Sequence, residues 1–205
     1  MKRLTLFILL VFFNTLIFSQ EWSSTNSNDP KNVIGVFSNS GICQPLGAKG
    51  TTSTFTFHGK EAYSIGLKYQ RPISERFSLE TGISYSKYSI RIHFVDDGIS
   101  DNLNDHLRTI SIPVLLKRYS PKDFFFRFGS MIEFGLSRKG EYAITDAQTG
   151  FGISIGAGKE FVLNKFSFDI APNIDIHSII PFSSHIFQQK LFVLGLKFGI
   201  SYSLN

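Results

Sequence analysis

Apolar and polar residues alternate along much of the chain, and the C-terminal segment shows the pattern most clearly. In "LFVLGLKFGISYSL" (191–204) the even positions carry bulky apolar side chains, whereas the odd positions are mostly small or polar. A period of two is typical of a β-strand whose two faces meet different environments. Segments of this character predict strands over 32–39, 62–71, 77–94, 107–119, 124–138, 151–161, 166–178 and 190–203.

The connections between these segments alternate in length. Three are short, at 72–75, 120–123 and 162–165, and they alternate with long ones at 40–61, 95–106, 139–150 and 179–189. Both kinds are populated by Pro, Asp, Asn and Gly, as turn chemistry requires. Tight turns at one end and long loops at the other predict an up-and-down meander. Eight such strands can close into a barrel without free edges.

The composition of the two stripes indicates which face points outward. One stripe is bulky and apolar, as in Phe124, Phe126 and Phe128, and the other is rich in Gly and Ser with occasional charges. An eight-stranded lumen is nearly filled by side chains and therefore requires small residues. The prediction is an all-β, eight-stranded antiparallel up-and-down transmembrane β-barrel with its apolar face in hydrocarbon. A soluble periplasmic lipocalin-like barrel that binds a ligand inside remains the alternative fold.

Aromatic residues bracket the short turns, as expected for an interfacial girdle at headgroup depth. These residues are Tyr69 and Phe77, Tyr119 and Phe124, Phe161 and Phe166, with Tyr202 near the chain end.

Three irregularities predict bulges. The apolar positions change from odd to even between Ser86 and Lys87. Pro113 and Pro172 each remove a backbone donor from a predicted strand.

The N-terminus has the features of a secretory signal peptide. Lys2 and Arg3 precede the apolar run "LTLFILLVFF", and "NTLIFSQ" follows it. We expect residues 1–20 to be the signal peptide, cleaved after Ser19 or Gln20, and residues 21–205 to form the barrel domain. Removing two of the 21 basic residues leaves 19 against 16 acidic ones, which is too weak a bias for nucleic-acid binding. A single cysteine, Cys43, excludes an internal disulfide.

Charged residues in the small-residue stripe are candidates for a polar network in the lumen. They are Lys68, Glu80, Arg127, Glu133, Asp169 and Lys197, with Glu160 and Asp175 in the same stripe. An ion path through the barrel is one interpretation. The narrow lumen favours mutual charge neutralisation instead, and no cofactor is predicted.

The histidines suggest two further kinds of site, neither of which has a convincing spacing. All five histidines fall toward the long-loop end, near several aspartates, but their spacing matches no metal motif, so no metal site is predicted. The histidines are His58, His93, His106, His177 and His185, and the aspartates are Asp96, Asp97, Asp101 and Asp105.

An outer-membrane lipid-modifying enzyme, a lipid A acyl hydrolase or acyltransferase, is the alternative function. Asp175, His177 and Ser178 supply the residue types of a catalytic triad. Strand alternation places His177 and Ser178 on opposite faces, which argues against it.

Three stretches carry a family resemblance: "GLKYQRPISERFSLETGISYSKY" (66–88), "ISIPVLLKRY" (110–119) and the C-terminal "LGLKFGISYSL". Together with the signal-peptide exit "LIFSQ", they resemble the small outer-membrane β-barrel proteins of Bacteroidota, which include PorT-like proteins. The resemblance implies an integral protein of the outer membrane, in contact with its lipid and in some members an accessory of type IX secretion. We expect a non-catalytic structural role, or binding of an envelope or secretion-machinery partner through long loops such as 41–61.

Overall fold

The computed structural model describes residues 31–46, 55–96, 99–120, 123–136, 148–182 and 190–204. These residues form eight strands. They are β1 (Val33–Leu46), β2 (Phe55–Pro72), β3 (Phe77–Asp96), β4 (Ile99–Tyr119), β5 (Phe124–Gly135), β6 (Gly150–Leu163), β7 (Phe166–Pro181) and β8 (Lys190–Ser203). The predicted signal peptide lies outside the described residues.

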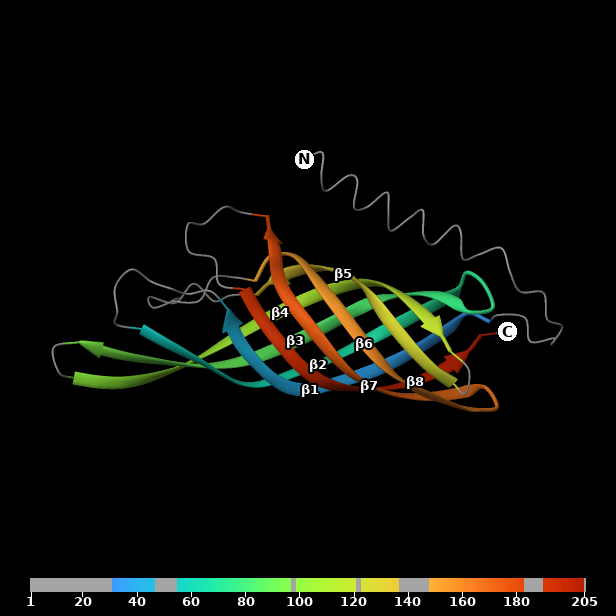
Figure 1. Ribbon diagram of the computed structural model, residues 1–205, viewed down its shortest axis with the longest axis horizontal. Coiled ribbons are helices and arrows are strands. Elements are labelled where there is room, and N and C mark those ends of the chain that lie inside the picture. The colour runs from blue at the N-terminus through green and yellow to red at the C-terminus, as the bar shows by residue number, and fades with distance from the viewer. Residues whose placement is uncertain are drawn as a thin grey trace.

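The strands form one closed antiparallel barrel in sequence order, and β1 closes it by pairing with β8 (Figure 1). Val33 of β1 pairs with both Gln70 of β2 and Ser203 of β8, so the described start and end of the chain lie at the short-turn end. The predicted up-and-down barrel is confirmed. Among the described residues, no helix has the length and apolar character needed to cross a membrane.

The exterior of the barrel is apolar and its interior is largely polar. On β2, Ile65 and Leu67 are 50% and 57% exposed, whereas Ser64 and Lys68 on either side of them are buried. The same alternation runs along β6, where Ile153 and Ile155 face outward and Ser154 inward. The face assignment made from the sequence is therefore correct, and no segment among the described residues covers this apolar exterior.

Strands β1 to β4 and β7 are longer at the long-loop end than the sequence pattern indicates. β1 runs to Leu46 and β2 begins at Phe55, so most of the expected loop 40–61 is strand. Similarly, β3 continues to Asp96 and β4 begins at Ile99, so the expected loop 95–106 is also mostly strand. The β4–β5 pairing ends at Thr109 and Gly135, and β3 and β4 extend beyond it (Figure 1). These predictions failed because strand pairing continues where the apolar alternation has ended.

The expected change of phase between Ser86 and Lys87 is wrong. Tyr88 and Ile90 are both 1% exposed and point inward, as Ser84 and Ser86 do. The strand keeps its phase, and the interior itself becomes apolar toward the long loops. In the pairing of β2 with β3, the bulge lies on β2, between Gly59 and Ala62.

The bulges expected at Pro113 and Pro172 are also absent from the described register. Pro113 pairs with Met131 of β5, and the β3–β4 register is the same on both sides of it. Pro172 likewise pairs with Leu196 of β8 in unbroken register. Each strand residue directs its N–H to only one neighbouring strand, so a proline interrupts one ladder and leaves the other intact.

The aromatic residues near the short turns point outward, with one exception. Phe124, Phe161 and Phe166 are each at least half exposed. Tyr119 instead has inward parity, and its hydroxyl donates to Glu160. Tyr119 is therefore not part of an outward girdle.

Candidate functional site in the barrel interior

A carboxylate at the centre of the lumen lies between two cations. Glu80 of β3 accepts a hydrogen bond from Lys197 Nζ of β8 at 3.1 Å, and Arg127 Nη1 of β5 lies 3.8 Å from the same oxygen. All three side chains are buried, and Lys197 also stands 3.8 Å above the centre of the Phe37 ring. Three strands far apart in sequence are thus joined across the barrel by opposite charges.

A second ion pair joins Lys68 of β2 to Asp169 of β7 across β1 and β8. The pair depends on a small neighbour, Gly199 of β8. A Cβ at Gly199 would collide with the Asp169 carboxylate and the Lys68 ammonium group. Glycine in the inward stripe therefore provides the space that buried charged side chains occupy.

A third cluster fills the short-turn end of the lumen. Lys117 Nζ donates to Glu160 Oε2 at 2.7 Å, and Tyr119 donates to the same oxygen at 2.8 Å. Gln70 donates to the Tyr119 hydroxyl, and Lys117 lies 4.2 Å from the centre of the Phe125 ring. Lys117 is not among the predicted lumen residues, although its odd position among the inward residues of β4 is a signal for it.

A buried histidine with a carboxylate and a phenol forms the fourth cluster. His177 Nδ1 is hydrogen-bonded to Glu133, and its Nε2 lies 3.2 Å from the Tyr88 hydroxyl. The backbone N–H of Ser178 donates to the other Glu133 oxygen at 2.9 Å. His177 lies toward the long-loop end, as expected from the sequence, since it pairs with Leu191 near the start of β8. Its ring is buried inside the barrel, where Tyr88 supplies its second partner.

The expectation that His177 and Ser178 occupy opposite faces is wrong, since both are buried. Ser178 has a φ of 51°, in the left-handed region, and the β6–β7 register shifts beside it. A bulge of this kind turns two successive side chains inward. Both ring nitrogens of His177 are nevertheless used by Glu133 and Tyr88, and Ser178 Oγ makes no hydrogen bond within the described part of the chain. No activated nucleophile results.

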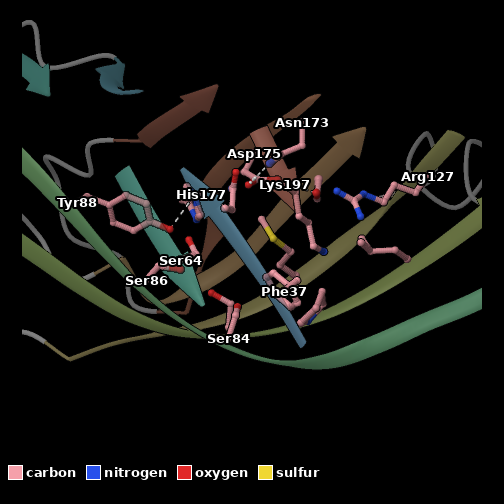
Figure 2. A pocket seen from close by; sticks show the side chains of 16 residues that line it. Phe37, Ser64, Ser84, Ser86, Tyr88, Arg127, Asn173, Asp175, His177 and Lys197 are labelled. Carbon is pink, nitrogen blue, oxygen red and sulfur yellow. Dashed lines mark hydrogen bonds between the residues drawn. The ribbon is translucent and has the colours of Figure 1, made fainter. Parts of the chain in front are cut away.

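Side chains of the first and fourth clusters, among them Arg127, Lys197 and His177, line a cavity of about 40 Å³ inside the barrel (Figure 2). Asp175 faces it and accepts hydrogen bonds from Ser154 at 2.6 Å and Asn173 at 2.7 Å. Serine side chains from β2, β3 and β4 complete the polar lining. The volume is enough for about three water molecules, but it is too small for an organic ligand.

An apolar cluster closes the lumen above this cavity, toward the long loops. Its members share very low exposure and come from β1, β2, β3, β4 and β8. They are Cys43, Ala62, Tyr88, Ile90, Leu107, Leu191 and Val193. Cys43, expected in a loop from the sequence, lies on β1 and buries its free thiol in this cluster.

All six predicted lumen residues lie in the interior and are buried. The structure brings Glu80, Arg127 and Lys197 together, pairs Lys68 with Asp169, and gives Glu133 the partner His177. Within the described residues, five carboxylates face four cationic side chains and His177. The carboxylates are Glu80, Glu133, Glu160, Asp169 and Asp175, and the cations are Lys68, Lys117, Arg127 and Lys197.

No group of three or more metal-ligating side chains lies together within the described part of the chain. His58, His93 and His106 lie on separate strands of the β2–β4 sheet. His185 and Asp97 lie outside the described residues, as do the side chains of Asp96, Asp101 and Asp105.

The sequence matches no protein-family model and no curated protein. Among solved structures, the chain is similar to the outer membrane protein OprG from Pseudomonas aeruginosa, with a TM-score of 0.53 and 12% identity over 86% of this chain and 96% of that one. It is also similar to the outer membrane protein AlkL in DMPC lipid bilayers, with a TM-score of 0.50 and 9% identity over 91% and 96% of the two chains. At these identities the likeness is one of fold, and the fold is that of small outer-membrane β-barrels.

Proposed function

We propose that the chain is an integral outer-membrane β-barrel protein, delivered by the signal peptide 1–20, with a structural or partner-binding role and no catalysis. The observation that carries this proposal is the apolar surface on the exterior of the barrel. Bulky apolar side chains such as Leu67, Phe124 and Phe198 are about half exposed around a closed barrel whose interior holds the charges. Soluble proteins rarely expose apolar patches beyond a few hundred Å², and a closed barrel satisfies its backbone in lipid.

The filled lumen supports a role that does not involve transport or chemistry inside the barrel. Ion pairs cross it at mid-barrel, the Lys117–Glu160 cluster fills the short-turn end, and the apolar cluster around Ile90 and Leu191 fills the other. The same filling argues against a lipocalin-like ligand site. Catalysis on lipid A would require a nucleophile at the membrane rim, whereas His177 and Ser178 lie inside.

The sequence resemblance to PorT-like proteins of Bacteroidota supports a more specific role as an accessory of an envelope or secretion assembly. A partner would meet the barrel at its projecting end. There β3 and β4 reach beyond the last β4–β5 pair, Thr109 and Gly135, and present the sheet outside the apolar band.

Two experiments test the proposal. Expressed with its own N-terminus in a bacterium with two membranes, the protein should fractionate with the outer membrane, begin near Glu21, and show a heat-modifiable gel shift. A chain that remains soluble in the periplasm without detergent would refute the membrane assignment. Mass spectrometry of lipid A should show the same acyl pattern with the wild type and with His177→Ala; a difference would establish an enzyme.

A further inference from the structure

The outward face of β2, β3 and β4 changes abruptly from apolar to basic. Ile65, Tyr85 and Ile110 form one cross-strand row of outward apolar side chains. The next row toward the long loops contains Tyr63 of β2, Lys87 of β3 and Arg108 of β4, again directly paired. Lys87 and Arg108 are both exposed. The change therefore takes place within a single row.

Lys87 and Arg108 are an unfavourable pair in isolation. Like charges directly opposite each other on one face of an antiparallel sheet destabilise it. Within the described part of the chain, neither side chain forms a salt bridge. An external anion between the two would turn their repulsion into a binding site.

The basic character continues beyond this row. Arg91 is exposed and pairs with His58 and Asn104 in register, and His106 is exposed opposite Ser89. Lys60, at the β2 bulge, donates to Asn104 at 3.2 Å and so lies on the same face. Glu61 is the acidic member among the described side chains here. We call the set Lys60, Lys87, Arg91 and Arg108, with His58 and His106, the basic face.

The height of the basic face on the barrel suggests what it contacts. Tyr63 and Tyr85 are 48% and 40% exposed and mark the upper edge of the apolar band, where amphipathic rings sit at the membrane interface. Lys87 is two residues beyond Tyr85, roughly 7 Å farther along the strand. That step places its ammonium group at the depth of lipid phosphates. Because the side chains point away from the barrel axis, they face neighbouring lipid.

We propose that the basic face binds phosphate groups of anionic lipid in the leaflet at the long-loop end; this inference rests on the proposed membrane function. Arg108 and Arg91 present planar guanidinium groups that suit phosphate oxygens, and Lys87 and Lys60 add charge. Bound phosphates neutralise the Lys87–Arg108 repulsion. The lipid selected at this position is therefore anionic, whereas apolar parts of the perimeter bind any lipid.

The test measures lipid preference locally, by quenching of one tryptophan by lipids with brominated chains. The reporter is Tyr85→Trp in a chain whose single natural tryptophan is removed by Trp22→Phe. The protein is folded into vesicles of equimolar phosphatidylcholine and phosphatidylglycerol, with one or the other brominated. A second reporter, Leu194→Trp on β8, has the outward neighbours Ile42 and Ile174 and no cation paired with it.

The Tyr85→Trp reporter should show a preference for phosphatidylglycerol of roughly fivefold for each cation in contact with a phosphate, and the Leu194→Trp reporter should show almost none. Lys87→Gln with Arg108→Gln should lower the preference by roughly fivefold for each phosphate contact that is lost, while Arg118→Gln, an outward cation at the short-turn end, should leave it unchanged. In pure phosphatidylcholine, Lys87→Gln alone should not lower stability in urea, because it removes a repulsion.

The outcomes separate this inference from the proposed function. Quenching of both reporters by both lipids, with equal preference at both positions, would overturn the phosphate site and leave the membrane barrel intact. A preference that is unchanged when Lys87 and Arg108 are removed would also overturn it. If neither reporter is quenched by any brominated lipid, the barrel does not insert, and the membrane function itself is wrong.

Discussion

A charge placed on the middle of the apolar exterior gives the most direct test that the outer face of the barrel contacts hydrocarbon. Leu196 lies midway along β8 (Lys190–Ser203) and is 37% exposed on the outer face, between Pro172 of β7 and Ser40 of β1. In a bilayer this exposed surface contacts hydrocarbon. We expect Leu196→Arg to reduce the free energy of folding into vesicles by about 2–4 kcal/mol, the cost of arginine at the midplane of a membrane barrel.

The same strand provides a matched control. Leu204 has the same parity, is 38% exposed, and follows the end of β8 eight residues after Leu196. At a strand tilt of about 40° that separation is roughly 20 Å along the barrel axis, beyond half of an apolar band about 25 Å tall. Leu204→Arg should therefore cost only about 0–1 kcal/mol.

The assay is reversible unfolding in urea from phosphatidylcholine vesicles, followed by the heat-modifiable gel shift. The two substitutions introduce the same side chain on the same face, so a difference between them reports depth in the membrane. Equal costs would mean that no hydrocarbon surrounds Leu196. A fully stable Leu196→Arg protein in buffer without lipid would refute the membrane barrel altogether.

Three further predictions concern the interior. Glu80→Gln removes the carboxylate that Lys197 and Arg127 share, and it should lower the free energy of unfolding by about 3–5 kcal/mol in the same assay. The control Glu61→Gln, at an exposed site, should change it by no more than about 0.5 kcal/mol. Equal effects of the two substitutions would mean that the central ion pairs are not needed for folding. Gly199→Ala should lower the free energy of unfolding by about 1–3 kcal/mol, because the added methyl group collides with the buried Asp169 carboxylate. The control Ala157→Val, on the outer face, should leave the stability nearly unchanged. A Gly199→Ala protein as stable as the wild type would contradict the tight packing of the interior. Cys43 is 2% exposed, so a maleimide should modify it only after unfolding in urea, and labelling of the folded barrel at the rate of the unfolded chain would show that the apolar cluster is open.

The sequence could predict which face of each strand points outward, because alternation with a period of two is a local property. The stripe containing Ile65 and Leu67 differs from the stripe containing Ser64 and Lys68 along the strand itself. The inward position of all six predicted charges follows from the same parity. Chain length and the alternation of short and long connections then led to the eight-stranded closed barrel.

The sequence could not predict where the strands end, and the errors share one cause. Outside the apolar band the outer face is polar, so Arg91 and His106 look like loop residues, although the backbone pairing of β3 and β4 continues past them. Inside the same region, Tyr88 and Ile90 are apolar because they close the lumen, and this reversal resembled a change of phase.

By itself, then, the sequence determined the two chemical faces, the number of strands and their order, since each depends on residues close together in the chain. Only the tertiary structure decided which charges pair, because Lys68 meets Asp169 and Glu80 meets Lys197 through the stagger of distant strands. It also decided that Ser178 turns inward beside His177, through a bulge that has no signature in the residue pattern. Alternation is written into each strand, whereas partners across a lumen exist only once the barrel has closed.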